Sequence, residues 1–166
     1  MMEMRELKLT DEATFNVYIK SWQTEQIVPT AIDLKRYASY SELVSELKQR
    51  NLNKESVPDT TLFLFDNGEI IGAVNIRHYL NEHLKRIGGH IGYGVRPDYR
   101  GQGYAKKLLR EGLEFLNQND VGDALVTCDK SNIASAKTIL AFHPKELEST
   151  VVDGEIVRRF LVSTNQ

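Results

Sequence analysis

Two hydrophobic periods run along this chain, and together they predict an alternation of strands and helices. Apolar and polar side chains that alternate indicate half-buried strands, whereas apolar residues three or four positions apart indicate amphipathic helices. The pattern predicts strands at 5–9, 61–65, 70–79, 90–95, 124–129, 147–152 and 156–162, and helices from about residues 11, 39, 101 and 133. This order fits an α/β fold in which helices cover a sheet. Because we see no repeat or linker, we expect one domain over residues 1–166.

Local signals mark several ends of these elements. Ser39 followed by Glu42 forms a capping box, which is typical of a helix start. The triplet 66–68 and the pair 153–154 contain Asp and Gly, which predict two hairpin turns. The charged stretch 80–89 ends in two glycines and predicts a loop.

The most distinctive segment is 94–109, where a strand gives way to a helix across two glycines. Pro97 ends the strand, because proline lacks a backbone N–H group and restricts the residue before it. Gly101 and Gly103 then stand where the helix begins. Glycine allows a ligand to approach the backbone closely, and the first N–H groups of a helix have no partner within it.

The charges around this turn indicate an anionic ligand. No acidic residue stands in the first helical turn, although acids are favoured at helix N-termini. The basic residues near it are Arg96, Arg100, Lys106, Lys107 and Arg110. Free amides together with positive side chains at a helix N-terminus are typical of a phosphate site.

Three different roles for the two glycines agree less well with the residues around them. The dinucleotide-binding fingerprint needs Gly or Ala at the position of Lys106, and a P-loop needs a Gly-Lys-Ser/Thr sequence that does not occur here. A tight turn before an ordinary helix would account for the glycines alone. It would not account for the register of Pro97, Arg100, both glycines and Ala105, or for the second motif that follows.

The segment Arg100-Gly101-Gln102-Gly103-Tyr104-Ala105 resembles the Arg/Gln-x-x-Gly-x-Gly/Ala signature of the GNAT (GCN5-related N-acetyltransferase) family. The stretch 132–136, which follows a predicted strand, is similar to the Asn-x-x-Ala/Ser element of the same family. The resemblance implies a mixed β-sheet that is splayed open between its fourth and fifth strands and flanked by helices. It also implies that acetyl-CoA is the acyl donor and lies in that gap.

The resemblance assigns roles to individual residues. It implies that pyrophosphate is bound by Arg100, Gly101, Gln102, Gly103, Tyr104 and Ala105. It places the pantetheine arm against the backbone of Val95 and the side chain of Asn132, and it suggests that the Val95 N–H group stabilises the oxyanion. His90 stands where many relatives carry a Glu, so we expect it to be the general base. An imidazole with an unperturbed pKa of about 6.5 can accept a proton at neutral pH. The alternative is a histidine that only packs or hydrogen-bonds.

The chain differs from the family pattern at two places that bear on catalytic turnover. The Tyr that usually acts as the acid would fall at Ile139, and the usual Gly-Phe after that helix is replaced within 142–144. Tyr93 and Tyr104 are the substitutes that the sequence offers, although a packing role explains both of them better.

The remaining polar candidates are less specific. Arg77 and His78 are consecutive on a predicted strand, so they face opposite sides of the sheet. A residue that lines the acceptor side and a residue that faces solvent on a half-exposed sheet explain this pair equally well. The four histidines lack the spacing of metal ligands, so we expect no metal. Cys128 is the single cysteine, which excludes an internal disulfide, and a packing role explains it best.

The composition excludes several classes of partner. The chain is 41% hydrophobic and 27% charged with a net charge of −2, which is typical of a globular protein without a bulk field for nucleic acid or membranes. The first residues carry charge where a signal peptide would have an apolar run, so we expect a cytoplasmic protein.

These observations predict an acetyl-CoA-dependent N-acetyltransferase. We expect direct transfer, in a ternary complex, to a primary amine on a small molecule or a peptide. The C-terminal hairpin offers an edge through which two copies could pair as a homodimer. The alternative is a non-catalytic acyl-CoA-binding sensor or scaffold, because the usual Tyr is missing and the loop at 142–144 is altered.

Overall fold

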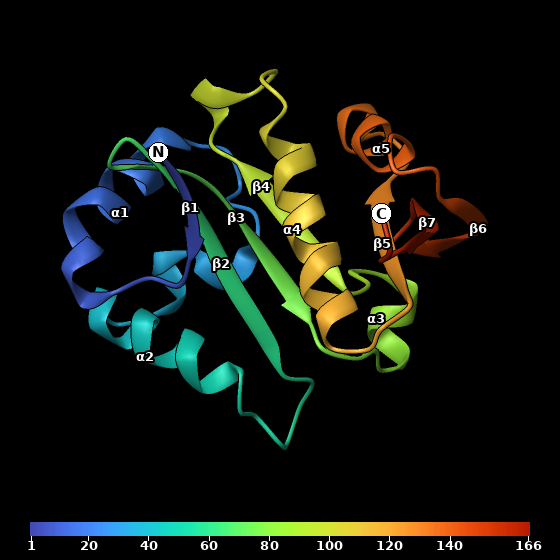
Figure 1. Cartoon of the computed structure of the whole chain (residues 1–166), viewed down its shortest axis with the longest axis horizontal. Helices are drawn as coiled ribbons and strands as arrows, with labels where there is room; N and C mark the ends of the chain where they lie inside the picture. The colour runs from blue at the N-terminus through green and yellow to red at the C-terminus, as the bar shows by residue number, and fades with distance from the viewer.

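The computed structural model describes all 166 residues, and its strands form two separate sheets (Figure 1). In chain order the strands are β1 (Met2–Arg5), β2 (Asp59–Asp66), β3 (Glu69–Arg77), β4 (Ile91–Val95), β5 (Asp123–Asp129), β6 (Lys145–Val152) and β7 (Glu155–Ser163). The helices are α1 (Glu12–Ser21), α2 (Tyr40–Arg50), α3 (Glu82–Arg86), α4 (Tyr104–Gln118) and α5 (Ile133–Leu140). Short 3₁₀ helices lie at Leu9–Asp11, Thr30–Ile32, Leu34–Arg36 and Pro97–Tyr99.

The first sheet has the order β1-β2-β3-β4 and the second has the order β5-β7-β6. All hydrogen-bonded strand pairs are antiparallel. The predicted α/β class is therefore confirmed. The splay expected between the fourth and fifth strands is a division into two sheets, whose neighbouring strands β4 and β5 run in the same direction (Figure 1).

Helices cover both faces of the first sheet. On one face α1 and α2 pack on a cluster that includes Phe15, Tyr18, Trp22, Leu43, Leu47, Phe63, Phe65 and Ile70. On the other face α4 packs on a cluster that also joins α5 and the second sheet and includes Ile76, Ile91, Leu108, Leu113, Leu116, Ile139 and Phe160. Each fully buried Leu or Ile stabilises the fold by about 2 kcal/mol. None of the helices combines the length and the hydrophobicity that crossing a bilayer requires.

The start of α2 confirms the predicted capping box in a modified form. The Ser39 hydroxyl accepts a hydrogen bond from the Glu42 N–H group at 3.2 Å. The Glu42 carboxylate reaches back to the N–H group of Ala38 at 3.0 Å, one residue before the cap. Two backbone donors at the helix end are therefore satisfied by side chains.

The prediction of a strand at 5–9 is wrong, because β1 covers only Met2–Arg5. Leu7 is buried with the α1 and α2 cluster, but Leu9 is 63% exposed, so the alternation of these two residues does not describe one sheet face. The Arg5 side chain turns toward Asp11 and forms an ion pair at 2.8 Å. Arg5, opposite Phe63, is the last residue of β1 that pairs with β2.

The predicted loop 80–89 contains the five-residue helix α3. The Asn81 side chain caps this helix by accepting a hydrogen bond from the Leu84 N–H group at 2.9 Å. A single helical turn is too short to produce a hydrophobic period, so the pattern alone could not separate it from a loop.

The strands of the two sheets are joined by hydrogen bonds only where β4 and β5 begin. The His90 N–H group donates to the Leu125 carbonyl oxygen at 2.7 Å, and the Leu125 N–H group donates to His90 Nδ1 at 2.9 Å. Two residues before His90, the Gly88 N–H group donates to the Thr127 hydroxyl at 2.9 Å. Beyond this junction β4 pairs with β3 alone, so its other edge has no strand partner.

Candidate functional site

The glycine turn leads directly from the end of β4 into α4. Gly101 and Gly103 have φ angles of 77° and 86°, which lie in the left-handed region that favours glycine. The helix therefore begins at Tyr104 with Gly103 as its N-cap, rather than at about Gly101 as the sequence predicted. A Cβ atom at either glycine would meet no atom within 4 Å, so the turn is open to the outside.

The backbone donors of this turn have no acceptor within the protein. The first amide in the helix with a partner is that of Lys107, which donates to the Gly103 carbonyl at 3.3 Å. The amides of residues 101–106 make no backbone or side-chain hydrogen bond. The first turn also contains no acidic residue. This concentration of free N–H groups at a positive helix end suits a phosphate or pyrophosphate.

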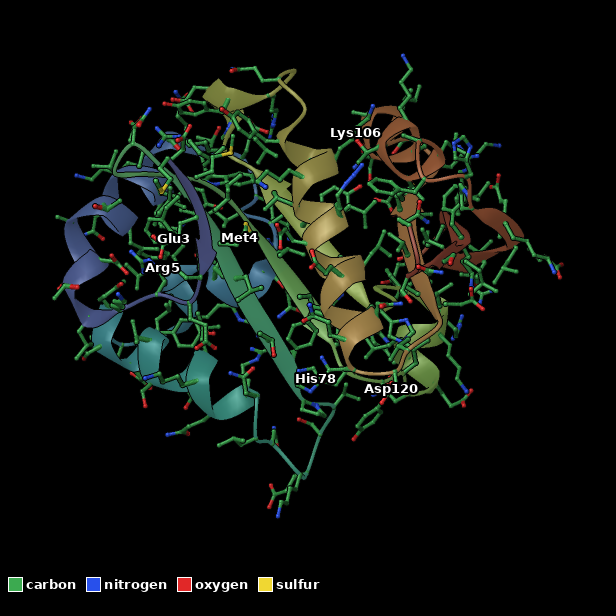
Figure 2. The ribbon with its side chains drawn as sticks, viewed as in Figure 1. Glu3, Met4, Arg5, His78, Lys106 and Asp120 are labelled. Carbon is green, nitrogen blue, oxygen red and sulfur yellow. The ribbon has the colours of Figure 1, made fainter.

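The basic residues near the turn divide into two groups. Arg96 is buried against Asp98 at 2.8 Å, and Arg100 forms an exposed ion pair with Glu25 at 2.9 Å. The sequence predicted that all five cations surround the anion, and the structure corrects this for Arg96. Lys106 and Arg110 have no carboxylate within 4.0 Å, and Figure 2 shows Lys106 on the side of α4 toward α5.

The unpaired edge of β4 supplies further free amides. The Arg96 N–H group donates to the Ile71 carbonyl, and the Arg77 N–H group donates to the His90 carbonyl. Antiparallel pairing alternates, so the N–H groups of Tyr93 and Val95 must point away from β3 and toward β5. Neither amide has an acceptor in the protein. The Val95 amide is therefore an outward-facing donor, and the Tyr93 amide is a second one that no sequence pattern indicated.

Asn132 lies at the N-terminus of α5, directly after β5. Its side-chain oxygen accepts a hydrogen bond from the Ser135 N–H group at 3.1 Å, so it is the N-cap of this helix. The side-chain NH₂ group has no partner and is exposed. The ends of β4 and β5 thus bring Val95, the glycine turn and Asn132 to one end of the molecule (Figure 1).

His90 lies at the opposite end of β4, at the junction of the two sheets. The side chain is buried, and its Nδ1 lone pair accepts the Leu125 N–H bond. Burial, and to a lesser degree the charge of Arg77, lower the pKa of this imidazole. A neutral imidazole with Nδ1 as acceptor carries its proton on Nε2, so neither ring nitrogen has a lone pair ready for an incoming proton.

Tyr93 crosses the space between the two sheets. Its hydroxyl lies 3.0 Å from the hydroxyl of Ser135 on α5. Burial raises the pKa of Tyr93 to about 12. Ile139, at the position of the usual family Tyr, is fully buried in the core. Tyr104 packs edge-on against Tyr99, with ring centroids 6.1 Å apart.

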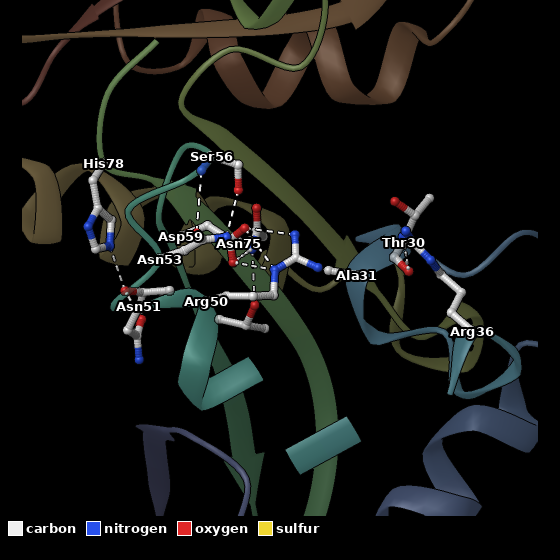
Figure 3. A network of polar contacts seen from close by, with 12 residues as sticks. Thr30, Ala31, Arg36, Arg50, Asn51, Asn53, Ser56, Asp59, Asn75 and His78 are labelled. Atoms are coloured by element: carbon white, nitrogen blue, oxygen red, sulfur yellow. Dashed lines mark hydrogen bonds and ion pairs between the residues drawn. The ribbon is translucent and has the colours of Figure 1, made fainter. Parts of the chain in front are cut away.

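A polar network lies on the α1 and α2 side of the first sheet (Figure 3). Arg50 binds the buried Asp59 through three hydrogen bonds of 2.7 to 3.1 Å. The Asn75 amide donates to both Asp59 and Thr61 at 3.0 Å. These contacts join residues far apart in the sequence, and no local motif indicates them.

Arg77 and His78 face opposite sides of the sheet, as the sequence predicted. Arg77 follows Asn75 on the α1 and α2 side, and its guanidinium donates to the Gly88 carbonyl at 3.0 Å. His78 lies 2.8 Å from the Thr60 hydroxyl, and its ring packs against Phe115 of α4.

No group of three or more His, Cys, Asp or Glu side chains is placed to hold a metal ion. Cys128 is free and buried, in agreement with the packing role expected for it.

Comparison with known proteins supports the same assignment. The family model described as the acetyltransferase (GNAT) family matches residues 20–143. The chain belongs to the GNAT acetyltransferase family. This membership confirms the resemblance drawn from the glycine turn, and with it acetyl-CoA as the acyl donor on which the family acts. No curated protein is similar enough in sequence to be matched.

Solved structures show the same fold at low sequence identity. An N-acetyltransferase from Staphylococcus aureus Mu50 has a TM-score of 0.68 at 19% identity, over 99% of each chain. A putative acetyltransferase from Salmonella typhimurium, solved with its cofactor acetyl-CoA, has a TM-score of 0.66 at 15% identity, over 99% of this chain and 95% of that chain. A chimera of spermidine N-acetyltransferase from Vibrio cholerae and hSSAT has a TM-score of 0.67 at 13% identity, over 98% and 95% of the chains.

Proposed function

We propose that this GNAT member transfers an acetyl group from acetyl-CoA to a primary amine of a small molecule or peptide, directly in a ternary complex. One observation carries the proposal: two sets of free amides lie at the junction of β4 and α4, those of Tyr93 and Val95 on the edge of β4 and those of 101–106 at the start of the helix. A pyrophosphate suits the second set, and an amide-containing arm that ends in a thioester suits the first.

Each part of the donor has a candidate partner. The pyrophosphate would lie on the amides of Gly101, Gln102, Gly103, Tyr104 and Ala105, with Arg100 and Lys106 nearby. One pantetheine amide would donate to the outward carbonyl of Val95, and another would accept from the free NH₂ group of Asn132. Arg100 would have to exchange Glu25 for phosphate. That exchange costs little, because an exposed ion pair contributes only about 0 to 1 kcal/mol.

The reaction forms one bond and breaks another. The amine nitrogen attacks the thioester carbonyl carbon, the resulting oxyanion is stabilised by an outward N–H group of β4, and the C–S bond then breaks. We assign the oxyanion to the Val95 amide, with the Tyr93 amide as its neighbour. The thiolate leaves readily because its thiol has a pKa of about 8.5. We propose the Tyr93 hydroxyl as the donor of a proton to the thiolate, while the surplus proton on the attacking nitrogen passes to solvent, from which Tyr93 is reprotonated.

The base is assigned differently from the expectation based on sequence. For His90 to accept a proton at Nδ1, it would have to release the Leu125 N–H group. We therefore propose that His90 is a positioning residue that fixes the junction of the sheets. The acceptor amine, with a pKa near 10.4 if it resembles lysine, then loses its proton to solvent before attack.

The test is acetyl-CoA consumption with a panel of amines. Free thiol should appear faster than in buffer with at least one amine, and mass spectrometry should find that amine heavier by one acetyl group. A non-catalytic acyl-CoA-binding module is the competing function, favoured by Ile139 at the position of the usual Tyr. Such a module would bind acetyl-CoA in a calorimeter yet release no thiol with any amine.

A further inference from the structure

Arg77 is a half-buried cation without an anionic partner. Its guanidinium has five N–H donors, and the structure gives it one acceptor, the Gly88 carbonyl at 3.0 Å. No carboxylate oxygen lies within 4.0 Å of it. Burial lowers the pKa of Arg77, partly offset by the charge of Asp59, yet a guanidinium remains charged at neutral pH. A partly desolvated charge without a partner is costly, which indicates that the position serves something other than stability.

The carboxylate nearest to Arg77 in the sheet already accepts hydrogen bonds from other residues. Asp59 stands opposite Arg77 in the strand register, but its two oxygens accept three hydrogen bonds from Arg50 and one from Asn75. Arg50 and Asp59 neutralise each other, so Arg77 leaves this part of the sheet face positive.

Arg77 also lies over Gly92 of β4, the strand whose outward amides form part of the proposed donor site. The three atoms nearest to the position of a Cβ on Gly92 all belong to its guanidinium, at 3.4 to 3.8 Å. Gly92 immediately precedes Tyr93, whose amide faces the gap between the sheets. The opposite face of β4 is filled by the side chains of Ile91 and Val95 packed in the α4 core. An acceptor that approaches the thioester from the α1 and α2 side therefore passes over Gly92 and meets Arg77.

We infer that Arg77 is a specificity-determining residue that binds a carboxylate of the acceptor, and that the acceptor is an amino acid or a similar amine with a carboxylate beside its amino group. This inference rests on the proposed acetyl transfer and names the substrate class for it. The planar fork of a guanidinium matches the two oxygens of a carboxylate. Because the same charge repels cations, polyamines are disfavoured acceptors here, although spermidine acetyltransferases share the fold.

The experiment compares matched pairs of amines that differ only in the carboxylate. Leucine is paired with isopentylamine and phenylalanine with phenethylamine, and spermidine serves as a polycation. In the wild type, kcat/KM should be higher for each amino acid than for its decarboxylated partner. In Arg77→Gln this ratio should fall about 10- to 100-fold, the usual effect of removing a hydrogen bond to a charged group. Arg77→Lys should fall in between, because it keeps the charge and loses the fork.

The ratio is measured within each variant, so a loss of folded protein cancels from it. Arg86→Gln on α3 is the matched control, since Arg86 is exposed and its one contact is to the Val151 carbonyl at 3.4 Å. It should keep the wild-type ratio. Equal turnover of amines and amino acids, a preference for spermidine, or an unchanged ratio in Arg77→Gln would overturn the inference while leaving acetyl transfer intact. Binding of acetyl-CoA without turnover of any amine would overturn the proposed function and this inference with it.

Discussion

The imidazole of His90 accepts the backbone N–H group of Leu125 at 2.9 Å, and this contact fixes the point where β4 and β5 separate. A buried side chain here completes a connection that a strand pair would normally make through its backbone. The sheets are held together at this point, where the His90 N–H group also donates to the Leu125 carbonyl and the Gly88 N–H group donates to the Thr127 hydroxyl.

Two substitutions at His90 separate a positioning role from a base role. In His90→Gln the side-chain oxygen can still accept the Leu125 N–H bond, so turnover should stay within a few-fold of wild type. In His90→Leu the buried N–H group loses its acceptor, which should cost about 1 to 3 kcal/mol of stability and reduce turnover. Denaturant titration and initial rates measure both effects. A rate loss of about 100-fold in His90→Gln, with unchanged stability, would restore His90 as the general base.

The free energy of unfolding should depend on pH through the titration of His90. The pKa of His90 is lowered in the folded protein, so between that value and about 6.5 the unfolded state binds more protons. The free energy of unfolding should therefore fall as the pH drops below about 6.5. His78, whose pKa burial also lowers, contributes in the same direction. Denaturant titrations at pH 7.5 and 5.5 should show a smaller loss in His90→Gln than in wild type. Identical losses would contradict the assignment.

Gly103→Glu should abolish acetyl-CoA binding, because it places a negative charge at the free amides of the glycine turn. Gly154 in the β6–β7 turn is a matched control. It also has a positive φ angle, of 80°, and no atom within 4 Å of a Cβ position. Gly154→Glu should share the backbone strain and keep the affinity. Calorimetric titration of both folded variants measures the difference, and wild-type affinity in Gly103→Glu would remove the turn from the donor site.

Asn132→Asp should weaken acetyl-CoA binding several-fold while the melting temperature changes little. Aspartate keeps the oxygen that caps α5, a contact worth about 1 kcal/mol, but it loses the NH₂ donor. Asn81 caps α3 through the same kind of contact, so Asn81→Asp is the control and should bind normally. If both variants bind like wild type, Asn132 is only a helix cap.

The parts of this protein that the sequence predicts well are those specified by local chemistry. The capping box at Ser39, the turn at 153–154 and the glycines at 101 and 103 each depend on residues within a few positions of one another. The strand predicted at 5–9 is wrong because Leu7 and Leu9 alternate in the sequence, although Leu7 is buried with the α1 and α2 cluster and Leu9 is exposed.

The chemistry of the acceptor side could not be predicted in the same way. His90 and Leu125 are 35 residues apart, and only their contact shows that the imidazole lone pair is occupied. The alternation of Arg77 and His78 was visible in the sequence. The sequence did not show that Arg77 lacks an acidic partner, because Asp59 is bound by Arg50 of α2 and no local pattern reveals that contact.

The unpaired edge of β4 has a thermodynamic consequence. An exposed strand edge is a template on which another chain can add, and it is a liability for solubility. A bound donor whose amides pair with Tyr93 and Val95 would occupy the edge as a further strand does. Acetyl-CoA would therefore shield the edge of β4 from other chains until the acceptor binds. Ligand at 100 times its Kd stabilises a folded protein by about 2.7 kcal/mol through mass action alone. The concentration of acetyl-CoA would then affect the stability of the folded protein as well as its turnover rate.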